Sequence, residues 1–233
     1  MTARRLSALA GLLVLTGALI YGLNTRIQGL PSAATLLDPV DGLYRTARQA
    51  RPPADSSRLR LSALDHPVTV VRDERHVPHV FAQSDRDAVI ALGYVAAQDR
   101  LFQLDFLPRV ASGRLSAAFG PSSLQADRFL RRTGMEWGAQ RNLERIREEK
   151  DVEWKAMKWY GAGVNAYLDR LAPADLPLEF RLLGYEPDRF SPIQGLRLLQ
   201  YMNYDLTYNS DDPSYSALRQ ELSESAYERL YPQ

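Results

Sequence analysis

The chain has 233 residues, enough for one ordinary domain with an appendage. Its 45% hydrophobic and 24% charged residues are typical of a globular protein and argue against wholesale disorder. The formal net charge of +1 gives no field that would concentrate a polyanion, so we expect no nucleic-acid partner. The absence of cysteine excludes disulfides, thiolate metal sites and a cysteine nucleophile.

The first element is an uncharged run over residues 6–25, preceded by Arg4 and Arg5. As a helix, about 20 residues rise about 30 Å, the thickness of a hydrocarbon core. The run therefore predicts a transmembrane signal anchor over 6–25 with a cytoplasmic tip at 1–5. A cleaved signal peptide and a buried helix are the alternatives. The basic residues before the run predict a single-pass inner-membrane protein with its domain on the periplasmic or extracellular side.

Prolines punctuate the next segment, residues 26–58, which we expect to be extended and membrane-proximal. Its stretch 36–44 is too apolar for a free linker, so we expect that stretch to pack on the surface of the domain. Short strands are then predicted at 59–61, 68–71 and 77–81. So few strands cannot form an independent sheet with both faces covered, so another element must complete the core.

From Ser84 the apolar period becomes helical, and Ser84 with Asp87 resembles a capping box. Apolar spacing carries this helix to about residue 106, and Pro108 disturbs its end. Further helices are predicted over 152–171, from Ser191, and from Asp212 to residue 231, with the apolar positions of the helix from Ser191 expected to be buried. The fold class expected is α+β and mainly helical.

Motifs that carry catalytic chemistry are missing: there is no Gly-x-Ser-x-Gly, glycine-rich phosphate loop or His-Glu-x-x-His. We therefore predict no catalytic residue in this chain. His76 and His79 lie three apart on a predicted strand and would face opposite sides, so we expect structural roles rather than a shared metal. Asp99 and Arg100 are expected to form a partly buried ion pair that fixes their helix to its neighbours.

Two stretches carry a resemblance to a known family. They are 71–82, read as Val-Arg-Asp-Glu and then Val-Pro-His-Val-Phe-Ala, and 93–120, from Gly-Tyr-Val-Ala-Ala-Gln-Asp-Arg to Phe-Gly. With weaker agreement at 160–166 and 178–184, residues 66–232 resemble the α chain of the penicillin acylase (penicillin amidase) family of N-terminal-nucleophile hydrolases. The chain departs from the family pattern at His76, where glycine is common, at Phe190, where tryptophan is common, and at Gln194, where aspartate is common. His76 is expected to strain its turn.

The resemblance implies that residues 59–233 are an incomplete portion of a four-layer αββα fold. Such proteins are made as one precursor and cut autocatalytically into α and β chains. The nucleophile is the serine that begins the β chain, so this chain would be catalytically silent without that partner. The implied substrates are small acyl amides, such as β-lactam side chains or N-acyl amines, hydrolysed at a linear amide bond without an organic cofactor.

The resemblance also implies site residues. Met202 and Leu206 match positions that line the acyl pocket of relatives, with ordinary helix core as the alternative. Leu206 replaces a phenylalanine, which favours aliphatic over phenylacetyl groups, and Asp205 stands where some relatives carry an arginine near the pocket mouth. Asp212 matches a glutamate that ligates calcium, with Asp211 as a substitute ligand. An N-cap is the alternative role of Asp212.

The sequence is also compatible with two other interpretations of the whole chain. The chain could be a non-catalytic, membrane-anchored binding or scaffold module, or the product of a truncated gene.

Overall fold

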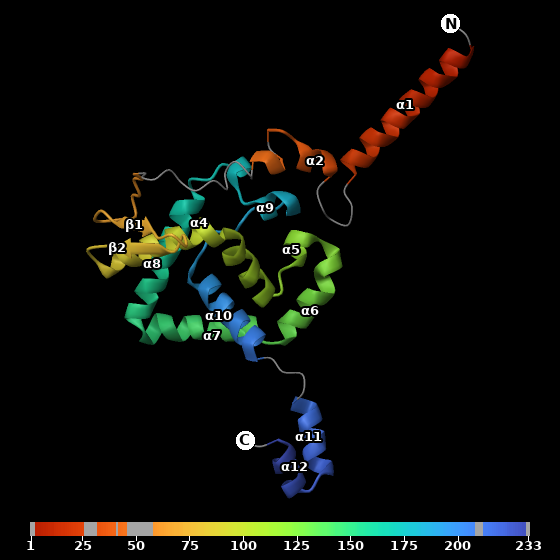
Figure 1. Ribbon diagram of the computed structural model, residues 1–233. Coiled ribbons are helices and arrows are strands. Elements are labelled where there is room, and N and C mark those ends of the chain that lie inside the picture. Colours follow the sequence, from red (N-terminus) through yellow and green to blue (C-terminus); the bar gives the residue numbers. More distant parts are fainter. Residues whose placement is uncertain (1–2, 26–31, 41, 46–57, 208–211, 232–233) are drawn as a thin grey trace.

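A computed structural model describes residues 3–25, 32–40, 42–45, 58–207 and 212–231. The first helix, α1 (Ala3–Asn24), projects from the body of the protein, and the last two helices stand at the opposite end (Figure 1). Between them lie a helical body and one two-stranded sheet. The chain is therefore mainly helical, as the sequence predicted.

The predicted membrane anchor is not supported. A helix does form over the uncharged run, and its described apolar side chains, such as Leu12 and Val14, are exposed. Yet among the residues that the structure describes, no helix is both long and apolar enough to cross a membrane.

The described residues 32–40 and 42–45 pack on the body, as the apolar stretch 36–44 predicted. They include a short helix, α2 (Ala33–Leu37), where an extended segment was expected. The Arg181 guanidinium donates to the carbonyl of Gly42 at 3.1 Å, and Arg45 pairs with Asp175 at 2.7 Å. These contacts fix the segment against α9 (Leu178–Leu183) and the turn before it.

The sheet is an antiparallel hairpin of β1 (Thr69–Arg72) and β2 (Pro78–Phe81), with Thr69 opposite Phe81. These two strands were predicted; the strand predicted at 59–61 does not form. The Arg72 guanidinium donates to both carboxylate oxygens of Asp99, at 2.8 and 2.9 Å, and so fixes the hairpin to the helix that follows.

The ion pair between Arg72 and Asp99 shows that the predicted pairing of Asp99 with Arg100 is wrong. Neighbours in sequence point different ways around a helix, and Asp99 pairs instead with Arg72 from the hairpin. Arg100 has non-helical backbone angles, φ −141° and ψ 26°, and marks a kink.

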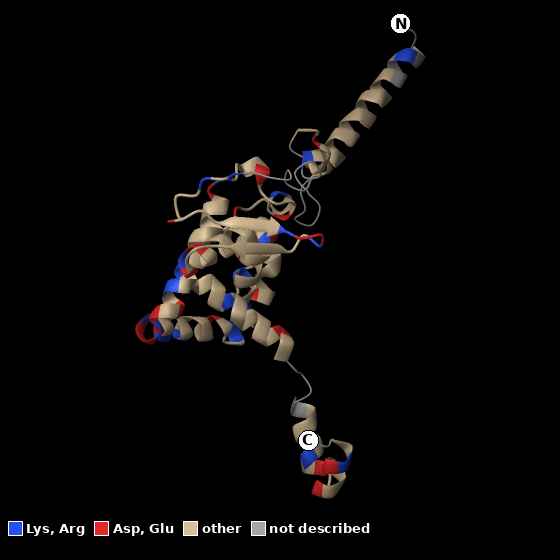
Figure 2. Cartoon of the chain, turned by 60° about the vertical axis from the view of Figure 1, so that its left-hand side comes forward, with Lys and Arg blue, Asp and Glu red and all other residues tan. Residues whose placement is uncertain are grey.

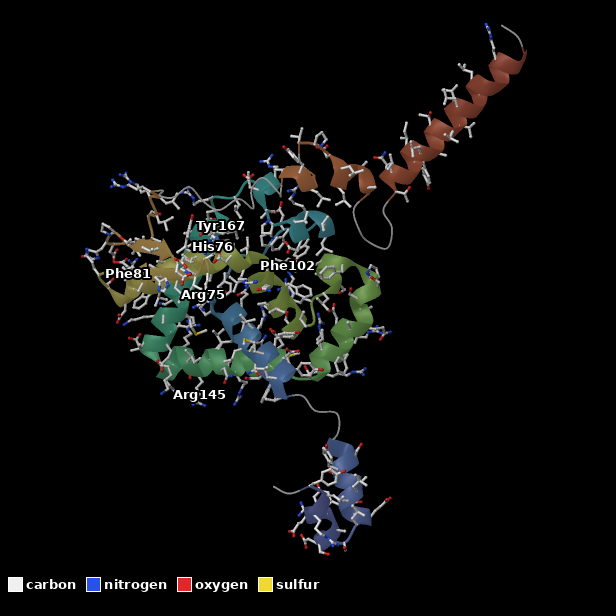
Figure 3. All side chains as sticks on the ribbon, in the orientation of Figure 1. Arg75, His76, Phe81, Phe102, Arg145 and Tyr167 are labelled. Carbon is white, nitrogen blue, oxygen red and sulfur yellow. The ribbon has the colours of Figure 1, made fainter. Side chains whose placement is uncertain are left out.

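His76 is also not on a strand, as had been predicted, but in the hairpin turn. Its φ of 61° lies in the left-handed region that glycine adopts without strain, which agrees with the strain expected there. Arg75 and His76 lie at the turn end of the hairpin and Phe81 at its open end (Figure 3).

The centre of the body is the pair α4 (Asp85–Ala111) and α8 (Asp151–Leu168). A Cβ on Gly93 would lie 2.1 Å from the carbonyl oxygen of Tyr160, and one on Gly163 would lie 1.9 Å from that of Ile90. The two helices therefore cross at a distance that only glycine permits. The apolar core around this crossing contains these buried residues: Ala97, Leu101, Leu104, Val164, Leu176, Phe180 and Phe190.

The start of α4 confirms half of the predicted capping box. The Ser84 hydroxyl accepts from the Asp87 backbone N–H at 3.1 Å. The Asp87 carboxylate does not return to the backbone of Ser84; it accepts from Asp65 N–H at 2.9 Å and contacts His66 Nδ1 at 3.0 Å. This buried carboxylate thus holds the segment before the hairpin, and the Asp65 hydrogen bond chiefly lowers its pKa to about 2.

Five further helices complete the body: α5 (Ser116–Phe119), α6 (Leu124–Arg132), α7 (Met135–Glu149), α9 and α10 (Pro192–Thr207). The single helix predicted from Asp212 to residue 231 is instead two helices, α11 (Asp212–Glu221) and α12 (Glu224–Leu230), because a new helix starts after Ser223. Acidic and basic residues alternate along the helices of the body in the cartoon of Figure 2.

Candidate functional site

The candidate site is built on α10, whose beginning is tightly held. Ser191 donates to the Gln194 side-chain oxygen through its backbone N–H at 3.1 Å and through its hydroxyl. Asn165 of α8 makes two hydrogen bonds to the Phe190 backbone, at 2.8 and 2.9 Å. The helix start predicted at Ser191 is therefore confirmed, and the Gln194 side chain takes part in the N-terminal cap of α10.

A buried ion network holds the loop that leads into α10. Asp105 and Arg109, one turn apart on α4, have side chains only 5% and 7% exposed and pair at 2.7 Å. Asp105 also accepts from the Asp188 backbone N–H at 2.8 Å, and Arg109 reaches the Asp188 carboxylate at 3.0 Å. Burial, and secondarily the charge of Asp105, raises the pKa of the Tyr185 hydroxyl, whose ring lies under Arg109. Sequence reasoning missed this network.

The middle of α10 is fixed to α7. Arg197 donates to both carboxylate oxygens of Glu136, at 2.6 and 2.5 Å. Burial raises the pKa of Glu136, but its hydrogen bond to Arg197 and the nearby charge outweigh that effect, so the pKa is lowered. Both side chains are therefore charged at neutral pH, and their ion pair fixes the orientation of α10 about its own axis relative to α7.

The predicted acyl-pocket residues follow on the far half of α10 and are not core. Met202 is 49% exposed and Leu206 is 77% exposed. The prediction that the apolar positions of α10 are buried holds for Leu196 but is wrong for the others, because Leu199 is exposed as well. Ordinary core packing is thus excluded for Met202 and Leu206, while binding of an acyl group stays a prediction. Asp205 lies on the same exposed half.

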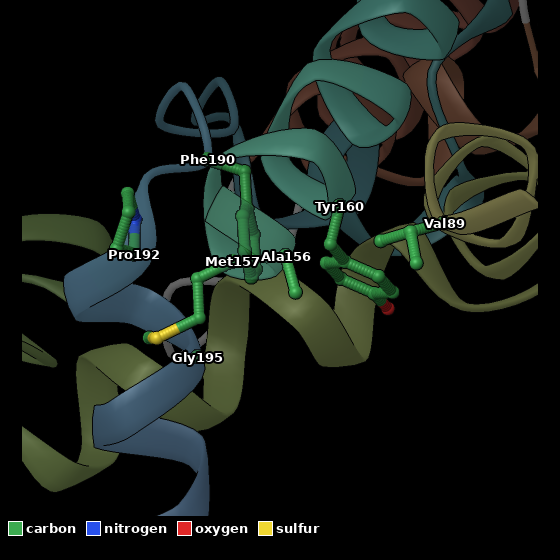
Figure 4. Close-up of a pocket in the computed structure, with 7 residues that line it drawn as sticks. All are labelled: Val89, Ala156, Met157, Tyr160, Phe190, Pro192 and Gly195. Atoms are coloured by element: carbon green, nitrogen blue, oxygen red, sulfur yellow. The ribbon is translucent and has the colours of Figure 1, made fainter. Parts of the chain in front are cut away.

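An apolar pocket of about 250 Å³ lies at the other end of α10. Its lining comes from α4, α8, α10 and the loop before α10 (Figure 4). The lining residues are Val89, Ala156, Met157, Tyr160, Phe190, Pro192 and Gly195. No lining residue is charged, so this pocket offers shape and apolar surface rather than chemistry.

The side chains predicted to ligate calcium lie outside the part of the chain that the structure describes. Within that part, no three His, Asp or Glu side chains gather as metal ligands. Asp211 lies outside the described residues, and so does the side chain of Asp212, the residue at which α11 begins. The N-cap alternative for Asp212 falls on the same undescribed side chain.

Comparisons with known proteins agree on one family. The sequence model of the penicillin amidase family matches residues 67–233. The chain is 41% identical over 157 residues to the penicillin acylase 2 proenzyme of Pseudomonas sp. strain SE83, covering 67% of this chain and 20% of that protein. It is 31% identical over 157 residues to the acyl-homoserine lactone acylase QuiP of Pseudomonas aeruginosa, covering 67% of this chain and 18% of that protein.

A solved structure gives the same result. The thermostable penicillin G acylase from Alcaligenes faecalis superposes with a TM-score of 0.58 at 27% identity, covering 70% of this chain and 90% of the matched chain. The present chain spans about a fifth of the length of the curated relatives that it matches. Sequence and structure therefore place this chain in the penicillin amidase family.

Proposed function

We propose that this chain is the α-chain part of an amidohydrolase that cleaves linear amide bonds of acylated compounds, such as β-lactam side chains or N-acyl amines. The observation that carries the proposal is the family match over residues 67–233. Relatives named penicillin acylase and acyl-homoserine lactone acylase both remove acyl groups, which supports an acyl amide as substrate.

The proposal assigns the chemistry to a second polypeptide. A serine at the start of that polypeptide would attack the amide carbonyl while its own α-amino group takes the hydroxyl proton. The C–N bond would then break as that proton passes to the leaving amine, and water would hydrolyse the remaining acyl ester to a carboxylic acid and free serine. This chain would supply part of the acyl pocket through Met202 and Leu206. Their exposure supports this role, because both side chains are free to be covered by a substrate or a partner.

The substrate preference follows from the same two residues. A flexible thioether and a branched aliphatic side chain suit an aliphatic acyl group, so we propose a preference for aliphatic over phenylacetyl amides. Asp205 beside them would disfavour substrates with a negative charge near the pocket mouth.

Calcium is proposed as a structural ion only. Carboxylate oxygens are its usual ligands, and Asp212, with Asp211 as a substitute, would donate one or two of them. The remaining ligands would come from the second polypeptide. No catalytic step depends on this ion.

The test is co-expression of this chain with the part of the strain SE83 proenzyme that follows its matched region. We expect hydrolysis of N-acyl amides only when both polypeptides are present, with aliphatic substrates preferred. Leu206→Phe should shift the preference toward phenylacetyl amides. A stable pair of polypeptides without hydrolysis would favour the non-catalytic binding module instead.

A further inference from the structure

Two opposite faces of α10 have different surroundings. Arg197, Tyr201 and Tyr204 are spaced by four and three residues, so they share one face of the helix. Tyr201 and Tyr204 pack, half-buried, against a buried cluster that includes Met135 of α7. Arg197 binds Glu136 of the same helix, and α7 lies against α10 (Figure 1). This face therefore holds α10 to the body of the protein.

The opposite face of α10 carries Met202 and Leu206. At about 3.6 residues per turn, these residues lie about 140° and about 180° around the helix axis from Arg197. Their side chains reach about 5–6 Å from that axis, so a rotation of about 20° would displace them by about 2 Å. A displacement of about 1 Å can already cost about a hundredfold in rate when it misplaces a substrate. Whatever fixes the rotation of α10 therefore fixes the position of both side chains.

The contact between Glu136 and Arg197 is suited to fixing a rotation. The guanidinium donates to both carboxylate oxygens, at 2.6 and 2.5 Å, and such a planar fork sets direction as well as distance. Gln140, one turn further along α7, donates to Glu136 Oε1 at 2.8 Å and steadies the carboxylate. The side chains of Arg197 and Glu136 are 14% and 24% exposed, so salt screens this pair less than it screens exposed pairs. The pair thus joins α10 to α7 at a defined angle.

The two helices also approach each other closely beside this pair. Gly138 comes two residues after Glu136, and Gln200 comes three residues after Arg197. A Cβ on Gly138 would lie 3.3 Å from Gln200 Cδ, which is closer than most such contacts in proteins. The missing side chain at Gly138 therefore lets α10 lie close to α7 next to the ion pair.

We propose that Glu136 and Arg197 are positioning residues that determine which acyl groups the site accepts. By fixing the rotation of α10, the pair sets where Met202 and Leu206 meet the acyl chain. The inference rests on the proposed function, and it adds two residues that act through α10 rather than by touching the substrate. The effect of the pair should grow with the length of the acyl chain, because a long chain would lie against both side chains and an acetyl group would not.

The experiment uses the full chain co-expressed with the part of the strain SE83 proenzyme that follows its matched region. Glu136→Gln keeps the shape of the side chain but leaves one oxygen to accept from Arg197. Arg197→Lys keeps the charge and removes the planar fork. Glu149→Gln is the matched control, because it makes the same substitution on α7 in an exposed pair, with Arg145 at 3.5 Å. Melting temperatures of the variants show whether the fold is kept.

We expect the ratio of kcat/KM for octanoyl amides to that for acetyl amides to fall at least fivefold in Glu136→Gln and in Arg197→Lys, chiefly through a higher KM for the octanoyl substrate. Glu149→Gln should keep the wild-type ratio. Equal losses for both substrates would show a merely structural role and overturn the proposal. An unchanged ratio in both variants would also overturn it, while hydrolysis by the wild type would leave the proposed function standing.

A measurement on this chain alone tests the fixed rotation separately. The chain has no cysteine, so Leu206→Cys and Glu148→Cys place two spin labels at exposed positions of α10 and α7. We expect the distribution of distances between the labels to become at least twice as wide when Glu136→Gln is added, and to stay the same when Glu149→Gln is added. Equal widths would overturn the proposal with or without hydrolysis. Absence of hydrolysis with the wild-type chain would overturn the proposed function and, with it, the role of the pair in acyl selection.

Discussion

The crossing of α4 and α8 and the far half of α10 show opposite kinds of surface. At the crossing, glycine brings two backbones into contact, and Ile90 and Val164 are 1% and 2% exposed. On the far half of α10, every apolar side chain of the candidate site is exposed. The first region is packed within this chain, whereas the second is left open to solvent. The difference separates the part of the molecule that stabilises the fold from the part that is free to contact a substrate or a partner.

The largest expected effect comes from the network that connects the two regions. Asp105→Ala leaves Arg109 buried without its closest carboxylate and frees the Asp188 backbone N–H. We expect a loss of about 3–5 kcal/mol in the free energy of unfolding, the usual cost of breaking a buried pair. Urea unfolding measures it. The paired change Asp105→Leu with Arg109→Met should recover much of the loss, and no recovery would contradict the electrostatic explanation.

The helix crossing gives the next largest effect. Gly163→Ala places a methyl group 1.9 Å from the Ile90 carbonyl oxygen, so the helices must separate. We expect destabilisation of about 3 kcal/mol, the upper end for overpacking. Gly195→Ala on α10 is the matched control, because a Cβ there would make only ordinary contacts at 3.9 and 4.0 Å, and it should stabilise by up to about 1 kcal/mol. Equal effects of the two substitutions would remove the contrast between the regions.

A substitution in the hairpin turn is expected to increase the stability of the fold. His76→Gly relieves a φ of 61° that a side chain disfavours. We expect about 1 kcal/mol of stabilisation, reduced by the greater freedom of glycine in the unfolded chain. The melting temperature measures it, with His79→Gly on the adjacent strand as the destabilising control.

Acid is expected to remove the stabilisation that the Asp87 carboxylate provides. The pKa of Asp87 is lowered to about 2 in the folded chain, against about 3.9 in an unfolded one. Its carboxylate therefore stabilises the fold above pH 4, and the stabilisation is lost as the pH falls toward 2. Melting temperatures of the wild type and Asp87→Asn should differ at pH 6 and converge near pH 2. A difference that persists at pH 2 would show that the charge of Asp87 is not the cause.

Local patterns predicted many elements of the body, including both strands of the hairpin, the N-cap at Ser84 and the start of α10 at Ser191. The helices α6 and α7 were missed although their amphipathic pattern was present. The Asp105 network was missed because it joins positions 83 residues apart, and such pairing leaves no local signature. Met202 and Leu206 were proposed from family resemblance alone, since helical spacing by itself placed them in the core.

Some predictions remain as they were made. The location of the domain outside the cytoplasm is still a prediction from Arg4, Arg5 and the uncharged run that follows. The roles of Asp205, Asp211 and Asp212 also remain predictions.

Hydrogen exchange of the backbone amides tests the central claim most directly, when this chain alone is compared with this chain plus a probe, the part of the strain SE83 proenzyme that follows its matched region. We expect residues 88–104 and 154–168 to be protected in both samples. We expect residues 196–207 to gain protection, at least tenfold in exchange rate, only when the probe is present. Equal protection of all three segments in the chain alone, with no change on addition of the probe, would contradict this expectation.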